Sequence, residues 1–474
     1  MASGLPSSSA VAAAPRSGEP LRPQELGCYG LGVVAYQFTY TGLTALALPL
    51  FNLELGLNPV RVGAALTVAR LWDTLLNPFV GAWSDRTRTR WGRRRPWIIA
   101  GAIGMAIAYP LVWFAPHGAS PDRLTLHLFV MTWVLFTVFG VFSVPYLALG
   151  LELSPDYHER TRVQAWRTAF NIIPTLATGW FYWICQRPEF GDPIAGARWL
   201  GLVVAGVILM TGLAPGFGLK ERYYRVAAVV PPESLWHSLR ETLRCRPFLI
   251  VMAIIVFLSL GSMTTEALGF YVLAYHVFGG DTAAAAKLAG IATTVTALSA
   301  FAAIPLVTHV ERRFGKRRAL ALCLWAYLFV SAAKWWLASP AHPWTFVLIG
   351  VFAQFGTLGF WIIINSMKAD ICDWDELGSH RRREGAYGAV GSLMQKSAAA
   401  LTLMLSGLLI QGVGFNAALG AAQTPGAVLG MRLAFSFGPT VFLIVCLGLL
   451  RFYSLDAARM TDIRRQLEAR RGTV

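Results

Sequence analysis

The chain has 474 residues, of which 55% are hydrophobic and 14% are charged, and its mean hydropathy is +0.52. A soluble protein carries roughly a quarter charged residues, so this composition excludes an ordinary water-soluble protein and indicates a membrane protein. The formal net charge of +16 does not indicate nucleic-acid binding. The basic residues lie in short loops between apolar runs and not on one contiguous basic face.

Twelve apolar segments follow a tail, residues 1–25, which is rich in Ala, Ser and Pro and has no cleavable signal peptide. The tail is expected to be disordered and cytoplasmic. Each segment is long enough to cross a bilayer, which takes about 20 residues for a hydrocarbon core of roughly 30 Å. The expected spans lie near residues 26–52, 58–83, 97–115, 124–153, 162–185, 198–217, 247–276, 285–309, 318–338, 343–367, 386–412 and 428–452.

Span 2 contains a carboxylate, Asp73, near mid-bilayer. A charge inside hydrocarbon costs several kcal/mol and marks a functional site by default. Asp73 is therefore expected to bind a proton or cation, or to accept hydrogen bonds from a sugar. The alternative is a structural role beside an arginine such as Arg70, one helical turn away. Lys396 lies about 18 Å deep in span 11, so it is expected to pair with a carboxylate. Asp73 is the candidate partner. The alternative is that Lys396 only makes a structural contact between the two halves.

An arginine-rich loop follows span 2, with six arginines in residues 84–96. Loops with an excess of Lys and Arg face the cytoplasm. The loops after spans 8 and 10 are also basic, at 312–318 and 381–383, whereas the loops on the other side carry only Arg123 and Arg187. Both termini are therefore predicted to be cytoplasmic.

The two halves of the chain repeat. Arg90-Trp91-Gly92-Arg93-Arg94 after span 2 matches Arg313-Phe314-Gly315-Lys316-Arg317 after span 8. Two six-span halves with matching turns predict the parallel-repeat plan of secondary transporters, with a site near the midplane. The basic turns are expected to brace the cytoplasmic helix ends as the halves move; their candidate residues are Asp85, Arg93, Arg94, Arg313 and Arg317.

The expected parts after the tail 1–25 are a six-helix bundle at 26–217, a cytoplasmic linker at 218–246, a second bundle at 247–452 and a cytoplasmic tail at 453–474. The C-terminal tail is predicted to form a surface helix with Met460, Ile463 and Leu467 on one face, lying on the membrane.

Other charged residues also lie within spans. Arg167 in span 5 lines up with Asn171 and Thr175 at helical spacing, which predicts a polar stripe. The alternative for Arg167 is that it extends to the cytoplasmic surface. Glu266 in span 7 and Lys334 in span 9 lie nearer the outer surface, and pairing at a helix interface is the favoured interpretation for them.

Motifs for catalysis and metal binding are missing from the sequence. It lacks HExxH, Walker A and GxSxG, and its six cysteines are scattered singly. We therefore expect no enzyme, no metal and no cofactor, and transport driven by ion gradients if energy is used.

Several motifs together resemble those of the glycoside–pentoside–hexuronide:cation symporters, the melibiose-permease-like branch of the major facilitator superfamily. The resemblance covers nearly all twelve spans. It rests on Arg70-Leu71-Trp72-Asp73, Asn77-Pro78, Asp85-Arg86-Thr87-Arg88, Trp91-Gly92-Arg93-Arg94-Arg95-Pro96-Trp97, Val144-Pro145-Tyr146 and Ala369-Asp370-Ile371-Cys372-Asp373.

The resemblance implies an all-α membrane fold of twelve helices in two six-helix bundles, which alternate access around a central sugar site. It implies that Asp73, Arg167 and Lys396 bind the sugar and that Trp361 stacks on it. Tyr146, which also lies beside polar positions, is a further candidate for stacking.

The chain departs from the family at the cation site. The cation-coupling positions are Asp73, Asn77 and Ser143, and the last two are neutral where sodium-coupled members carry acids; the acidic position in span 1 is Gln37. One carboxylate with neutral oxygens is a poor sodium cage, so the sequence favours proton coupling.

The predicted function is secondary active transport of a sugar across the inner (plasma) membrane by proton symport, in a monomer without nucleic-acid partners. The alternatives are a sodium-coupled or uncoupled sugar facilitator, an exporter of another small solute, and a sugar sensor on a transporter fold.

Overall fold

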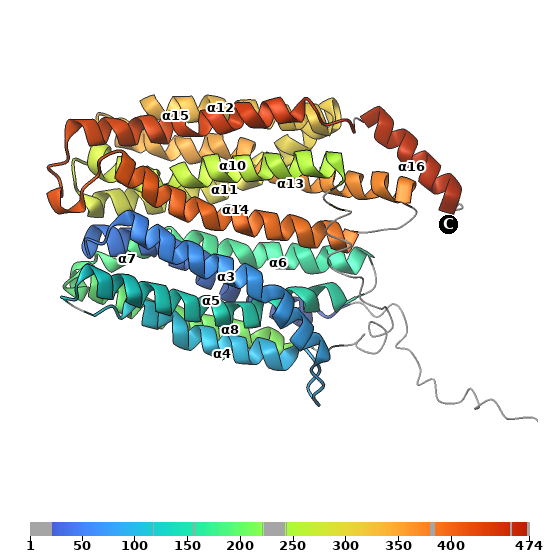
Figure 1. Cartoon of the computed structure of the whole chain (residues 1–474), viewed down its shortest axis with the longest axis horizontal. Helices are drawn as coiled ribbons and strands as arrows, with labels where there is room; N and C mark the ends of the chain where they lie inside the picture. Colours follow the sequence, from blue (N-terminus) through green and yellow to red (C-terminus); the bar gives the residue numbers. More distant parts are fainter. Residues whose placement is uncertain are drawn as a thin grey trace, which may run out of the picture.

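The computed structural model describes residues 21–471 except 117, 155–156, 220, 222–241, 243, 380–383 and 456. Long helices run side by side along the longest axis of the molecule (Figure 1). The first half comprises α1 (Pro23–Gln37), α2 (Leu43–Leu48), α3 (Pro59–Arg86), α4 (Arg95–Trp113), α5 (Pro121–Glu152), α6 (Tyr157–Thr178), α7 (Phe181–Cys185) and α8 (Pro193–Gly218). The second half comprises α10 (Arg246–Tyr271), α11 (Thr282–Phe314), α12 (Lys316–Leu337), α13 (Phe346–Ser379), α14 (Glu384–Gly412) and α15 (Pro425–Leu450), followed by α16 (Ala457–Arg471).

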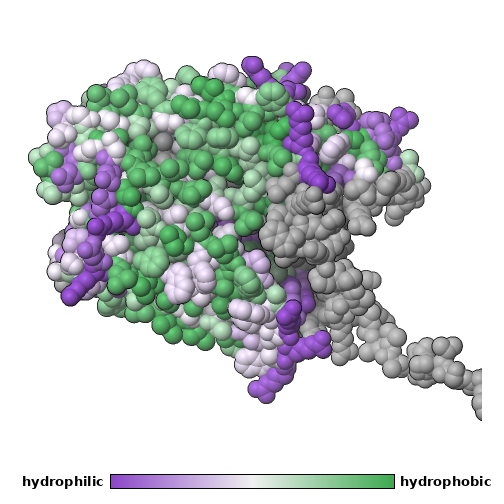
Figure 2. Space-filling view, in the orientation of Figure 1, coloured by the Kyte–Doolittle hydropathy of each residue, from purple (hydrophilic) through white to green (hydrophobic). Residues whose placement is uncertain are grey.

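Ten helices in the described part of the chain are long and apolar enough to cross a membrane. The other two expected spans form α3 and α6, which are long enough but more polar, since they carry Asp73 and Arg167. On the face that Figure 2 shows, hydrophobic residues cover the middle of the molecule and hydrophilic residues gather toward its two ends. The chain is thus a multi-pass membrane protein.

The helices pack mainly within the two halves. In the first half, α4 lies between α5 and α8, and α1 between α6 and α8; in the second, α12 lies between α13 and α15, and α10 between α14 and α15. The most extensive contact between the halves is that of α3 with α14. It brings the helix that carries Asp73 against the helix that carries Lys396.

Glycines allow α3 and α14 to approach closely. A Cβ atom on Gly63 would lie 2.4 Å from the carbonyl oxygen of Leu403, and one on Gly407 would lie 2.3 Å from that of Pro59. The Thr67 hydroxyl donates to the carbonyl oxygen of Ala400 at 2.8 Å. Small residues at a membrane helix crossing permit this backbone contact, as no side chain keeps the axes apart.

The buried apolar residues form two cores. One contains the first half together with the ends of α10, α14 and α15 that lie far from the arginine turns, through residues such as Leu268, Ile410 and Met431. The other contains the remainder of the second half, at the end that bears the turn 312–318. We call the end with the turns 86–95 and 312–318 the arginine-rich end, and the other the remote end. The halves share a core at the remote end.

The linker and the two tails of the chain were also assigned from the sequence. Most of the expected linker 218–246 lies outside the described residues, as do 381–383 and most of the tail 1–25. The prediction that α16 rests on the membrane through Met460, Ile463 and Leu467 is wrong, because these side chains are buried in the core of the second half. The apolar face of α16 is covered by this chain itself, through packing against α13.

Candidate functional site

The predicted pair of Asp73 and Lys396 lies between the two halves. The Lys396 ammonium is 3.1 Å from Asp73 Oδ2, and Asp73 is only 2% exposed. With its amide nitrogen toward Asp73, Asn77 donates to Asp73 Oδ1 (3.2 Å) and accepts from Lys396 Nζ (2.6 Å). The three side chains form one cluster, buried at Asp73 and partly buried at Lys396 and Asn77, in which carboxylate and ammonium satisfy each other, as a charge pair inside a membrane requires.

Local sequence explains how α3 presents this cluster. Asp73 and Asn77 are four residues apart and so share one face of the helix. That face meets Gly140 of α5, where a Cβ atom would lie 3.3 Å from Asp73 Oδ1. Pro78 inside α3 donates no backbone hydrogen bond, so the carbonyl group of Thr74 lacks its usual helical partner beside the cluster.

Arg70 is not the hydrogen-bonded partner of Asp73, contrary to the alternative that the sequence left open. Its guanidinium donates to Thr44 Oγ1 (2.6 Å) and to the carbonyl oxygen of Tyr40 (3.1 Å), and it lies 3.9 Å from the Tyr40 ring centroid. Tyr40 belongs to a π-helical turn in the first span, Phe38–Gly42. Such turns are frequent at functional sites because they expose backbone carbonyl groups.

Tyr36 of the first span lies near both the cluster and Arg167. The Tyr36 hydroxyl lies within electrostatic range of Lys396, Asp73 and Arg167. Arg167 itself donates to Gln164 at 3.4 Å, and its Nε atom is buried without a hydrogen-bond partner among the described residues. Arg167 therefore lies near the cluster without being bound to it. Tyr36 and Tyr40 were not singled out from the sequence, although their spacing of four residues was a signal.

The remaining predicted site residues differ in placement. Trp361 of α13 is half-buried and packs edge-on against Phe360, with ring centroids 5.2 Å apart. Tyr146 is fully buried, donates to the carbonyl oxygen of Tyr29 at 2.8 Å and stacks on its ring. In this conformation Tyr146 is part of the packing of α5 against α1. Ser143 is 1% exposed, and its hydroxyl has no hydrogen-bond partner among the described residues.

Two cavities lie beside residues near the cluster, and the first of them is lined by Arg70 and Ala399, each within one helical turn of a cluster residue. One, of about 440 Å³, is lined by Tyr40, Thr44 and Arg70 of the first half and by Glu266 and Ser406 of the second. The other, of about 460 Å³, extends into the second half. It is lined chiefly by α10, α11, α12 and α13, with Glu266, Thr296, Lys334, Gln354 and Thr357 as polar residues. Both cavities include Glu266 and Phe270. Volumes in this range suit small-molecule ligands.

Glu266 and Lys334 were expected to pair at helix interfaces, and in the structure their charges act on each other without a direct ion pair. Among the described residues, neither forms an ion pair, and Glu266 forms no hydrogen bond. The Lys334 ammonium instead lies 4.4 Å from the Phe435 ring centroid, a cation–π distance. Glu266 is exposed within the cavities.

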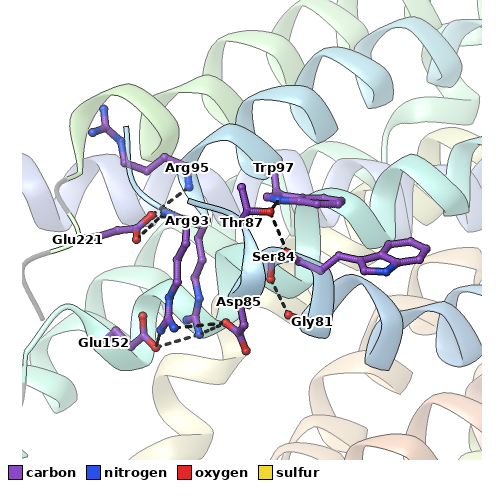
Figure 3. Close-up of polar contacts among 11 residues, drawn as sticks. Gly81, Ser84, Asp85, Thr87, Arg93, Arg95, Trp97, Glu152 and Glu221 are labelled. Carbon is purple, nitrogen blue, oxygen red and sulfur yellow. Dashed lines mark hydrogen bonds and ion pairs between the residues drawn. The ribbon is translucent and has the colours of Figure 1, made fainter. Parts of the chain in front are cut away.

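The arginine turn after α3 forms an ion-pair network (Figure 3). Arg93 and Arg94 both contact Glu152 of α5, the latter at 2.9 Å, and both lie within 3.7 Å of Asp85. Burial lowers the pKa of Arg93, but the hydrogen bond to Glu152 and the charges of Glu152 and Asp85 raise it by more. The Glu221 carboxylate accepts from the backbone N–H groups of Arg93, Arg94 and Arg95 at 2.8–3.1 Å, where the start of α4 favours a negative charge.

The second half repeats part of this network. Lys316 lies 2.6 Å from Asp370 of α13, as Arg93 lies beside Glu152 of α5. Gly92 and Gly315, at matching places in the two turns, both have positive φ angles, of 107° and 76°. The repeated turns therefore share a backbone shape as well as a sequence. Arg317 donates to the carbonyl oxygen of Arg451 at 2.9 Å, whereas Arg313 is exposed and lies beside Phe314.

Comparison with known proteins supports this description. An uncharacterized symporter of Synechocystis is 27% identical over 88% of this chain and 91% of its own length. The putative glycoside/cation symporter YagG of Escherichia coli is 25% identical over 93% of each chain. The sodium-dependent lysophosphatidylcholine symporter 1 of Gallus gallus is 23% identical over 93% of this chain and 88% of its own.

The fold is that of solved transporters. A D-xylose-proton symporter superposes with a TM-score of 0.59 at 14% identity, over 91% of this chain and 98% of its own. The family model described as MFS/sugar transport protein matches residues 28–457. These findings confirm the predicted transporter fold and the resemblance to cation symporters of glycosides. The chain belongs to the MFS/sugar transport protein family.

Proposed function

We propose that this protein, a secondary active transporter by family, carries a sugar into the cell across the inner membrane by proton symport. One observation carries the proposal: the buried ion pair of Asp73 and Lys396 joins the first half to the second. A contact between the moving parts that depends on one titratable group couples protonation to movement.

The chemistry follows from the charges. When Asp73 is ionised, it holds the Lys396 ammonium; when it takes a proton, the ion pair is lost and both side chains become available to sugar hydroxyl groups. Arg167, close by, supplies further donors for hydroxyl groups or for a hexuronate carboxylate. Trp361 would stack on the sugar ring once the halves close around it.

The same cluster argues for protons over sodium. Sodium favours several oxygen ligands, but the Asn77 oxygen already accepts from Lys396, and Asp73 is shared with that ammonium. The unpaired hydroxyl of Ser143 is a neutral oxygen and adds no charge. The positively charged Lys396 also repels a metal cation.

The closed remote end supports an orientation. If the arginine-rich end faces the cytoplasm, the shared core at the remote end seals the outer side. The conformation described here is then one that releases sugar inward, and the chain termini are cytoplasmic.

Uptake into membrane vesicles under imposed gradients tests the proposal. A proton gradient should drive accumulation of the transported sugar and a sodium gradient should not. Asp73→Asn should abolish accumulation while sugar exchange continues, because the amide cannot ionise. Accumulation driven by sodium, or an unaltered Asp73→Asn variant, would contradict the proposal. A lysolipid should be tested alongside the sugars, since one relative is named for such a substrate.

A further inference from the structure

The cavity in the second half is lined by two charged residues, Glu266 and Lys334, that are not part of the central cluster. Glu266 lies within an apolar segment long enough to cross the membrane, Arg246–Val277, and is exposed to the cavity. Ionised carboxylates are costly in such surroundings unless protein, water or a ligand supplies hydrogen bonds. Among the described residues the charge of Lys334 acts on Glu266 without a hydrogen bond to it, so a ligand in the cavity has an unused carboxylate acceptor available.

The opposite wall supplies donors. The ammonium of Lys334, on α12, is 3% exposed and lies over the Phe435 ring. Gln354 and Thr357 of α13 line the same cavity. With one carboxylate and one ammonium, the walls have no net charge, which favours a neutral ligand with many hydroxyl groups over an ion. Phe435 and Tyr327 add the aromatic surface that suits the C–H faces of a sugar ring.

The cavity shares two lining residues, Glu266 and Phe270, with the first cavity. Arg70, one helical turn from Asp73, lines the first cavity together with Glu266, and Glu266 also lines the second. From the first half, Thr175 of α6 reaches the second cavity. Thr175 ends the polar stripe that begins at Arg167, and in that stripe the Asn171 oxygen is buried without a partner among the described residues.

We propose that the cavity around Glu266 and Lys334 is a second ligand subsite, which takes a further sugar ring joined to the sugar held at Asp73 and Lys396. Glu266 accepts hydrogen bonds from hydroxyl groups of that ring, and Lys334 and Gln354 donate to its oxygens. The inference rests on the proposed sugar transport and assigns to it a two-ring glycoside as the preferred substrate.

Binding to the purified full-length protein tests this inference, with three matched pairs of probes. These are methyl α-glucoside with maltose, methyl β-galactoside with lactose, and methyl β-xyloside with xylobiose. For at least one pair we expect the two-ring compound to bind about tenfold more tightly by calorimetry. Glu266→Gln and Lys334→Met should each weaken two-ring binding about fivefold or more and change one-ring binding by less than about twofold. Gln354→Ala provides a further variant if either fails to fold.

Matched controls remove a like charge elsewhere. The control variants are Glu189→Gln and Lys287→Met. Glu189 lies in the exposed turn before α8, and Lys287 lies on the exposed side of α11. Neither residue lines the two cavities, so both variants should bind all probes as the unaltered protein does.

The outcomes separate this inference from the proposed function. If sugars bind but the cavity variants leave two-ring binding unaltered, or weaken both members of a pair alike, the second subsite is refuted and sugar transport stands. If no sugar binds the unaltered protein, both proposals fall. Binding of glycerophosphocholine that is lost in Glu266→Gln would overturn the sugar subsite in favour of a zwitterion site.

Discussion

The two ends of the helix bundle are held by different kinds of contact. At the remote end the halves share an apolar core, α3 crosses α14 at glycines, and Tyr271 of the second half donates to Asn52 of the first at 2.8 Å. At the arginine-rich end, the ion pairs of Arg93 and Arg94 with Glu152 and of Lys316 with Asp370 connect helices of the same half.

The difference suggests a division of labour. The apolar core and the glycines of the remote end carry no charge, so these surfaces can separate and meet again without leaving a buried charge unpaired. Ion pairs with several hydrogen bonds hold a fixed geometry and suit parts that move as one body. The remote end then acts as the seal between the halves, and the arginine-rich end keeps each half rigid.

The strongest test of the seal is Gly407→Leu. Because a Cβ atom there would meet the carbonyl oxygen of Pro59 at 2.3 Å, the halves cannot close as they do here, and overpacking of this kind costs about 1–3 kcal/mol. We expect uptake to fall about tenfold or more. Gly412→Ala is the control, as nothing lies within 4 Å of its added Cβ atom. Normal uptake by folded Gly407→Leu would show that the seal does not lie at this crossing.

A second test compares the two ion-pair clusters. Glu152→Gln removes the shared partner of Arg93 and Arg94, whereas Asp370→Asn removes a partner of Lys316. Glu152→Gln deprives two arginines of an ion-pair partner, whereas Asp370→Asn deprives one lysine. We therefore expect uptake to fall several-fold in Glu152→Gln and less in Asp370→Asn. Equal effects in initial-rate measurements would mean that the halves depend on their turns equally.

A third test concerns the pH dependence of the Arg93 ion pairs. The pKa of Arg93 is raised in the folded protein, so its contribution to stability is present at low pH and is lost only as the pH rises through that high value. Arginine side chains stay protonated throughout the pH range in which proteins are usually studied. At pH 9 the Arg93 ion pairs should therefore stabilise the protein as much as at pH 7. Glu152→Gln should lower the melting temperature by the same amount at both pH values.

The smallest effect is expected for Glu221→Gln. The amide still accepts hydrogen bonds from the N–H groups of Arg93, Arg94 and Arg95, but it loses the charge that favours the start of α4. Such charges contribute about 0.3–1 kcal/mol, which predicts a melting temperature lower by a few degrees at most and nearly normal uptake. A large loss of uptake would instead assign the chain after α8 a part in the movement.

The sequence by itself determined the class of protein and its central pair. Hydropathy, the arginine-rich loop and the repeat of Gly92 at Gly315 predicted a two-fold membrane bundle, because the bilayer penalises polar residues and restricts basic residues to one side. The cost of a charge in hydrocarbon also predicted that Asp73 and Lys396 meet. Patterns of this kind depend on each residue's own chemistry and depth.

Only the tertiary structure decided which neighbours each group has. In the folded chain Arg70 donates to Tyr40 and Thr44, and Tyr146 is buried in helix packing. The apolar face of α16 packs against the second half, and Glu266 lines a cavity without a direct hydrogen-bond partner among the described residues. These outcomes depend on helix rotation and on close approach at glycines, which bring together residues far apart in the chain. Local sequence does not encode such rotations. They decide whether a charged side chain is paired within the fold or lines a cavity.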